Sequence, residues 1–80
     1  MFNAHIVSVS HKVLYKGLAS RVSLPGVEGE FEVADLHGPI AALLAEGAVL
    51  VTTVGKENQR FVIGQGIMRF DGKELYAIVE

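Results

Sequence analysis

Short runs of hydrophobic residues alternate with polar residues along this chain. Across residues 2–9, Phe2, Ala4 and Ile6 are separated by polar side chains, and this period of two indicates a β-strand with one solvent-facing side. Residues 18–24 repeat the pattern and predict one continuous strand. One face of that strand would carry Leu18, Ser20, Val22 and Leu24, and the other Ala19, Arg21 and Ser23.

Turn residues divide the next part of the chain into further strands. Pro25-Gly26 predicts a turn, after which Glu30 and Glu32 alternate with apolar neighbours and would share one face of a strand. Residues 48–54 are rich in β-branched side chains, so we expect them to form a strand that is buried on both faces.

Glycines punctuate the C-terminal part of the sequence. Asp71-Gly72 separates two β-prone runs and is the strongest hairpin signal in the chain. Gly64 and Gly66 interrupt the preceding run, which indicates a bulge or a close approach of two backbones.

Residues 39–46 fit a short helix by local pattern. Pro39 suits a first helical turn, an Ala-Ala-Leu-Leu run follows, and Gly47 stands just past the end. Local propensity alone therefore favours a helix here.

The pattern as a whole predicts an all-β fold. About seven short strands with turn signals roughly every 8–12 residues are typical of a sandwich or a small barrel. A chain of 80 residues holds one core, so we expect a single β-sandwich domain over residues 1–80. The chain has no cysteine, which excludes disulfides and thiolate metal ligands, and partner subunits remain as the means of stabilising so small a core.

Charge and hydropathy narrow the range of partners. The formal net charge is −2 and the 7 Lys and Arg residues are scattered, so we expect no nucleic-acid partner. The most apolar stretch, residues 38–54, is shorter than the roughly 20 residues that span a bilayer and contains Glu46. No secretory signal is visible at the N-terminus. We therefore expect a protein that stays inside the cell.

The sequence lacks the motifs of several enzyme classes. No Gly-x-Ser-x-Gly elbow presents a serine, and no Gly-x-x-x-x-Gly-Lys-Ser/Thr loop is present to hold a phosphate. A lipoyl or biotinyl carrier has a modifiable lysine between small or Met residues at a hairpin tip, and the Asp71-Gly72 tip, flanked by Phe70 and Lys73, lacks that pattern. We predict no catalytic residue, no cofactor and no ATP binding by the chain.

The histidines and one acidic pair are the remaining candidates for chemistry. His5, His11 and His37 are spaced too widely for a local metal site, and we predict no metal. His37 stays open as a functional residue because it lies in a loop of a β scaffold. Glu30 and Glu32 are typical of a solvated strand edge, with docking as the alternative.

Four motifs occur in order along the chain. They are Ile6-Val7-Ser8 with the turn Tyr15-Lys16-Gly17, then Gly26-Val27-Glu28-Gly29-Glu30-Phe31, then His37-Gly38-Pro39, and then Gly64-Gln65-Gly66-Ile67-Met68-Arg69. Over nearly its whole length the chain resembles the N-terminal domain of the epsilon subunit of proton-translocating ATP synthases. It departs from the family pattern at Glu32 and at Asp35-Leu36.

The resemblance carries expectations for fold, partners and site. It implies a sandwich of two antiparallel sheets, which overrules the helix at residues 39–46. It also implies a noncatalytic rotor subunit that couples the gamma subunit to the c-ring in ATP synthesis, peripheral on the cytoplasmic side of a bacterial inner membrane and monomeric when isolated. Glu30, Phe31 and His37 would be subunit-interface residues, with Glu30 and His37 facing the c-ring.

A free-standing β-sandwich binding module with an unrelated partner is the alternative. Copurification with a gamma subunit would favour the rotor subunit of ATP synthase, and a stable monomer without partners would favour the free-standing binding module.

In the family a C-terminal helical hairpin follows the sandwich and restrains ATP hydrolysis. Because this sequence stops at Glu80, we expect coupling without that restraint if these residues are the whole subunit.

Overall fold

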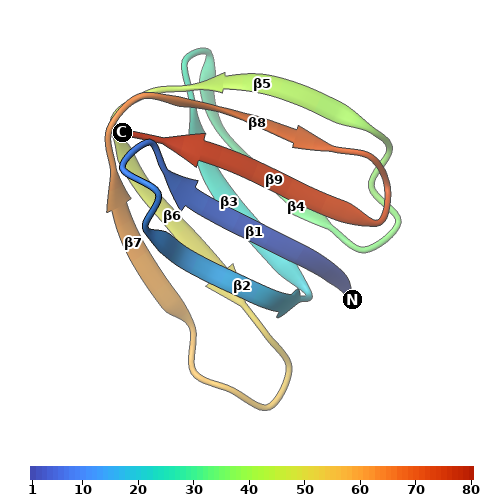
Figure 1. Ribbon diagram of the computed structural model, residues 1–80. Helices are drawn as coiled ribbons and strands as arrows, with labels where there is room; N and C mark the ends of the chain where they lie inside the picture. The colour runs from blue at the N-terminus through green and yellow to red at the C-terminus, as the bar shows by residue number, and fades with distance from the viewer.

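The chain folds into nine β-strands and no helix, and the computed structural model describes all 80 residues (Figure 1). The strands are β1 (Phe2–Ser8), β2 (Val13–Ala19), β3 (Arg21–Gly26), β4 (Gly29–Ala34), β5 (Ile40–Leu44), β6 (Gly47–Thr52), β7 (Gln59–Ile63), β8 (Gly66–Phe70) and β9 (Glu74–Val79). The apolar stretch 38–54 is divided between β5 and β6, and no helix of the structure has the length and apolar character needed to cross a membrane.

The strands form two layers that pack face to face. One layer has the order β2-β1-β9-β8-β5, and the other has the order β4-β3-β6-β7 (Figure 1). The two layers are joined edge to edge through a single residue pair, Gly26 of β3 with Leu44 of β5. β1 and β9 pair in parallel, whereas the other pairs are antiparallel. The predicted all-β sandwich is confirmed.

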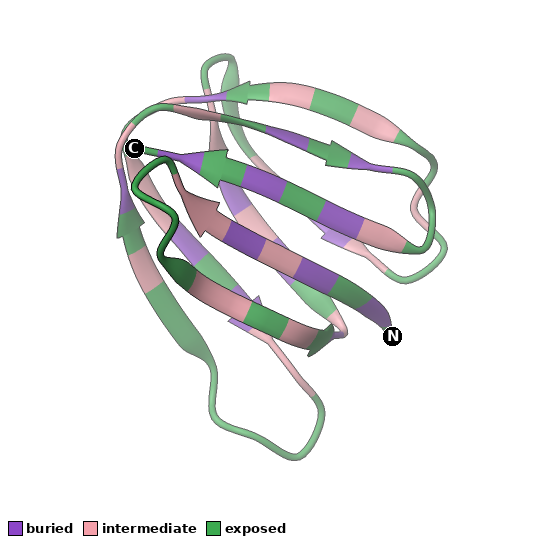
Figure 2. Cartoon of the chain, viewed as in Figure 1, coloured by how far each residue is buried: buried purple, intermediate pink, exposed green.

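One hydrophobic core lies between the layers. All 16 buried residues are hydrophobic, and buried positions alternate with more exposed ones along β1, β8 and β9 (Figure 2). Near one end of the core the rings of Phe2 and Phe70 meet edge to face, with their centroids 5.2 Å apart. Because each layer buries one face only, the outward side chains of both layers are free to contact other molecules.

The helix that local propensity favours at residues 39–46 is wrong. The structure has strand β5 there, as the family resemblance implies, and β5 pairs with β8 from Ile40 opposite Phe70 to Leu44 opposite Gly66. A helix of that length is marginal in water on its own. The ladder to β8 and the burial of Leu44 outweigh the local preference.

The single strand predicted over residues 18–24 is also wrong, because the chain turns a corner at Ser20. β2 ends at Ala19 in one layer and β3 starts at Arg21 in the other. The N–H and the hydroxyl of Ser20 both donate to the carbonyl oxygen of Thr52, at 2.8 and 2.9 Å. The corner reverses the faces, so that Ala19 is buried and Leu18 is exposed.

Two finer expectations fail on the four-stranded layer. Pro25 and Gly26 belong to β3, and the turn to β4 lies two residues later, at Val27-Glu28. β4 then starts at Gly29, whose φ of +128° favours glycine. β6 is buried on one face only: Val51 is in the core, whereas Leu50 is 40 % exposed. Nothing in this chain covers the outer side of the layer at Leu50.

Gly66 marks a close approach of two backbones, one of the two readings that the sequence allowed. A Cβ atom at Gly66 would collide with the carbonyl oxygen of Ile78 and would lie 2.9 Å from a methyl carbon of Val79. Gly66 lies at the start of β8, opposite Leu44 on one side and Val79 on the other. Because glycine has no side chain, the backbone of β8 can start at Gly66 between β5 and β9 without this collision.

The predicted hairpin at Asp71-Gly72 is confirmed, and Asp71 holds it. A carboxylate oxygen of Asp71 accepts the N–H groups of Lys73 and Glu74, each at 2.9 Å. These backbone N–H groups, first that of Glu74 and then that of Lys73, hold the pKa of Asp71 below its ordinary value of 3.8.

Asp71→Asn is expected to destabilise the domain in a pH-dependent way. Since the folded pKa of Asp71 is lowered, its carboxylate stabilises the fold above about pH 4, and that stabilisation is lost as the pH falls through the lowered pKa. The variant should therefore melt below the wild type at about pH 7 and approach it at about pH 2. Thermal unfolding at both pH values checks this, and an equal difference in Tm at both would contradict it.

Candidate docking surfaces

The chemistry-bearing side chains of this domain lie on its surface. None of the 16 buried residues is polar or charged, and no group of three His, Asp or Glu side chains is placed to hold a metal ion. The polar and charged side chains that could contact another molecule therefore lie on the outer faces and in the loops of the two layers.

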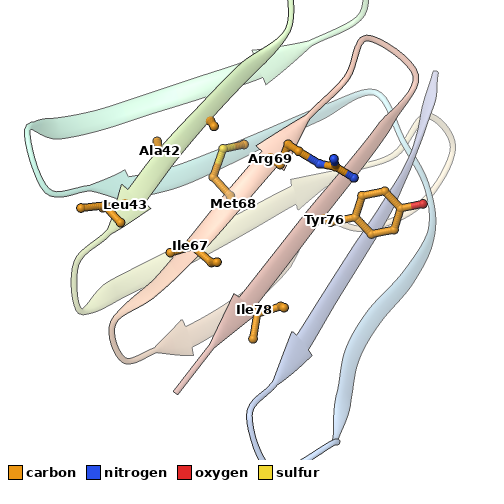
Figure 3. A pocket seen from close by; sticks show the side chains of 8 residues that line it. Ala42, Leu43, Ile67, Met68, Arg69, Tyr76 and Ile78 are labelled. Carbon is orange, nitrogen blue, oxygen red and sulfur yellow. The ribbon is translucent and has the colours of Figure 1, made fainter.

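The outer face of the five-stranded layer carries a continuous row of aliphatic side chains. Val7, Ile78, Ile67 and Leu43 are register neighbours across β1, β9, β8 and β5. Leu43, Ile67 and Ile78 are 61 %, 55 % and 49 % exposed. We call this row, together with the neighbouring His5, Tyr76 and Arg69, the apolar face. Figure 3 shows Leu43, Ile67, Ile78, Tyr76 and Arg69 of this face around a depression of 720 Å³ over β5, β8 and β9. A contiguous exposed apolar patch of this kind marks an interaction site more often than isolated surface leucines do.

A second row of the apolar face is aromatic and cationic. In register, His5 lies beside Tyr76, and Tyr76 lies beside Arg69. The rings of His5 and Tyr76 stack with centroids 4.7 Å apart, and the Arg69 guanidinium lies 5.7 Å from the Tyr76 centroid. His5 Nε2 is 3.3 Å from a carboxylate oxygen of Glu74. Partial desolvation, followed by the charge of Glu74, raises the pKa of Tyr76 above its ordinary value of 10.0.

The outer face of the four-stranded layer has a different character. Its central row runs Glu32, Ser23, Leu50 and Arg60 in register, and Arg21 lies 3.8 Å from Glu32 in an exposed ion pair. The two outer faces of the sandwich therefore differ, one being mainly apolar and the other mainly polar.

The structure places the three predicted interface residues along β4 and beyond it. Glu30 is exposed near the β3–β4 turn, and Phe31, next to it, packs on the rim of the core. His37 follows the opposite end of β4, where its Nδ1–H donates to the Gly38 carbonyl at 2.6 Å and its ring lies 6.2 Å from the ring of Phe70. Glu30 and His37 are thus separated by the length of the strand.

The loop that holds His37 is anchored at one side and exposed at its tip. The N-terminal amino group lies 2.8 Å from a carboxylate oxygen of Asp35. Leu36 has a left-handed backbone with φ 69° and a fully exposed side chain. This is the loop in which the sequence departs from the family pattern, and it projects an apolar side chain beside His37.

The sequence reasoning missed the apolar face. A signal was present in the run Leu75-Tyr76-Ala77-Ile78-Val79, which is apolar or aromatic at both alternating sets of positions. The structure buries one set and exposes the other. On a strand with only one covered face, the second apolar set is available for contact with another molecule.

Comparison with known proteins agrees with this architecture. The family model described as "ATP synthase, Delta/Epsilon chain, beta-sandwich domain" matches residues 1–80. ATP synthase epsilon chain 2 of Nitrobacter hamburgensis is 34 % identical over 79 residues, covering 99 % of this chain and 57 % of that protein. The epsilon chain of Sulfurimonas denitrificans is 35 % identical over 68 residues, covering 85 % and 52 %. The chain thus spans little more than half the length of these relatives.

Solved structures show the same fold. A chain of the Euglena gracilis mitochondrial ATP synthase (OSCP/F1/c-ring) aligns with a TM-score of 0.87 at 18 % identity, covering 98 % of this chain and 49 % of that one. A chain of the Tetrahymena thermophila mitochondrial ATP synthase (central stalk/c-ring) aligns with a TM-score of 0.77 at 12 % identity, covering 98 % and 62 %. Together with the sequence relatives and the family match over all 80 residues, this shows that the chain belongs to the ATP synthase delta/epsilon chain family and carries its beta-sandwich domain.

Proposed function

We propose that this chain is a noncatalytic subunit of the central stalk of an ATP synthase. In this role it joins the gamma subunit to the ring of c subunits, so that proton transport drives ATP synthesis. Family membership supports the assignment, and the observation that carries the docking role is the apolar face, an outward-facing aliphatic row across four strands of which Leu43, Ile67 and Ile78 are exposed. Such a subunit works peripherally, on the cytoplasmic side of a bacterial inner membrane.

The apolar face is the surface proposed to bind gamma. Stable interfaces between subunits have an apolar centre in which aromatic residues and arginine are enriched. Ile67 and Ile78 supply the aliphatic centre, and Tyr76 and Arg69 lie directly beside it. The polar outer face around Glu32 and Arg60 lacks this composition.

The β4 end of the sandwich is the surface proposed to meet the c-ring. Glu30 is exposed on a strand with one free edge, and His37 lies in the loop beyond the other end of that strand. A carboxylate and a titratable ring suit polar contacts that weaken with salt. Phe31 supports Glu30 from the core side without presenting its whole ring to solvent.

Cysteine cross-linking in the assembled enzyme tests both assignments, and the chain's lack of native cysteine makes each reaction site unique. Glu30→Cys and His37→Cys are expected to cross-link to subunit c, and Ile67→Cys to gamma. Arg60→Cys on the polar outer face is the matched control and should cross-link to neither. Cross-linking of the Glu30 and His37 variants to gamma alone would refute the c-ring assignment.

A further inference from the structure

Arg69 is a cation without a carboxylate partner on the apolar face. The two ion pairs of the chain use Asp35 and Glu32, and Glu74 lies 3.3 Å from His5; none of these contacts includes Arg69. Arg69 also donates none of the side-chain hydrogen bonds of the domain. One carboxylate oxygen of Asp71, two residues further along, accepts backbone N–H groups of its own turn, and the charge of Arg69 adds only a smaller contribution to the lowered pKa of Asp71, without an ion pair. The guanidinium donors are therefore available to another molecule.

Neighbouring side chains hold Arg69 in position. Its guanidinium lies 5.7 Å from the centroid of the Tyr76 ring. The Tyr76 ring itself stacks on the ring of His5, with an angle of 9° between the two planes. His5 in turn contacts Glu74 at 3.3 Å. Figure 3 shows the Arg69 side chain extended toward Tyr76. An arginine ordered in this way loses less conformational entropy on binding than a free one does.

The dimensions of the apolar face suit a helix. Leu43 of β5 and Ile78 of β9 lie two strands apart, with Ile67 between them, which corresponds to about 10 Å. Two turns of an α-helix rise by about 10.8 Å. A helix that crosses the strands can therefore set apolar side chains one turn apart along this row. Arg69 is two residues from Ile67 on β8 and so lies about 7 Å from the aliphatic row along the strand. One side of a helix placed on that row therefore lies over Arg69.

We infer that the apolar face recognises an amphipathic helix of the gamma subunit that carries an aspartate or glutamate against Arg69. The inference rests on the proposed function, which supplies gamma as the partner, and adds the chemistry that the partner must present. Aliphatic residues of the helix cover Ile67 and Ile78, and its carboxylate accepts hydrogen bonds from the guanidinium. A helix without the carboxylate would bury Arg69 unpaired, which weakens binding and so gives selectivity.

Titration of the chain with the gamma subunit of the same enzyme tests the pairing. Arg69→Glu is expected to weaken binding by about 100-fold and Arg69→Gln by at least about tenfold, because the helix carboxylate is left repelled or unpaired. Arg69→Lys should keep part of the affinity, because the lysine ammonium keeps the positive charge but cannot form the two parallel hydrogen bonds that a guanidinium makes to a carboxylate. The matched control Arg60→Glu, on the polar outer face, should bind within about twofold of the wild type.

A charge swap identifies the partner group. Each aspartate and glutamate on the gamma surface is changed to lysine in turn, and one of these variants should bind Arg69→Glu more tightly than it binds the wild type. Binding of Arg69→Glu and Arg69→Gln within about twofold of the wild type would overturn the inference. If Ile67→Asp still abolished binding in that case, the proposed function would stand. Sedimentation that showed a dimer of the chain, lost in Arg69→Glu, would assign the face to a second copy and also overturn the inference.

Discussion

Phe70→Ala is expected to lower the free energy of unfolding by about 3–5 kcal/mol, the cost of removing a fully buried aromatic ring and leaving a cavity. Phe70 is 1 % exposed and is the largest of the fully buried side chains. It contacts the ring of Phe2 at 5.2 Å and lies between Ile40 and Leu75 in the five-stranded layer. A single core of this size supplies only about 3–5 kcal/mol of net stability. The variant should therefore be largely unfolded at room temperature.

Urea denaturation followed by circular dichroism measures this effect. Phe70→Leu keeps most of the buried volume and should cost less than half as much, whereas Tyr76→Ala removes an aromatic ring that is 38 % exposed and should cost about 1 kcal/mol. A cooperative transition for Phe70→Ala close to that of the wild type would show that Phe70 does not anchor the core.

The double variant Ile67→Lys with Ile78→Asp is expected to weaken gamma binding by at least about 100-fold, because it replaces the apolar centre of the proposed interface by charges. Both side chains are about half exposed, so the core beneath them stays intact. Ile67 and Ile78 are register neighbours, and opposite charges at such a cross-strand pair attract, which preserves the β8–β9 ladder. The variant therefore separates binding from folding.

A calorimetric titration with gamma, beside a melting curve for each variant, measures the two effects separately. Leu50→Asp is the matched control, since Leu50 is similarly exposed but lies on the polar outer face. It should leave binding within about twofold of the wild type. Equal losses for the control and the double variant would place the interface elsewhere.

The strands and the C-terminal hairpin could be predicted because their signals are local. Phe2, Ala4 and Ile6 alternate with polar residues and do face the core, and Asp71-Gly72 supports the turn by hydrogen bonds within a few residues. Residues 39–46 show the opposite case. Their neighbour β8 lies more than twenty positions away in sequence, so local propensity contained no information about the pairing that decides their conformation.

The corner at Ser20 was not predictable for a related reason. Alternation across residues 18–24 is the same whether the chain stays in one layer or crosses to the other. The crossing depends on Thr52, a partner more than thirty positions distant. Alternation alone therefore identified β-structure here but did not separate β2 from β3 or assign them to different layers.

Some residues of the candidate docking surfaces could be predicted from the sequence and others could not. Glu30 and His37 were found because they lie in motifs that resemble those of a family, and the structure shows them to be accessible at the two ends of β4. The apolar face was missed because Leu43, Ile67 and Ile78 come from three strands. Each residue alone looks like a core residue, and only the register of the sheet brings the three together on an outer surface.

ATP-driven proton pumping by the reassembled enzyme tests most directly whether this chain couples the stalk to the ring. Membranes that contain the c-ring are combined with the catalytic subunits and gamma, with and without this chain, and the quenching of a pH-sensitive dye is followed after ATP is added. We predict that the wild-type chain restores pumping and that the double variant Ile67→Lys with Ile78→Asp does not. Equal pumping without the chain, or with the double variant in its place, would contradict the account.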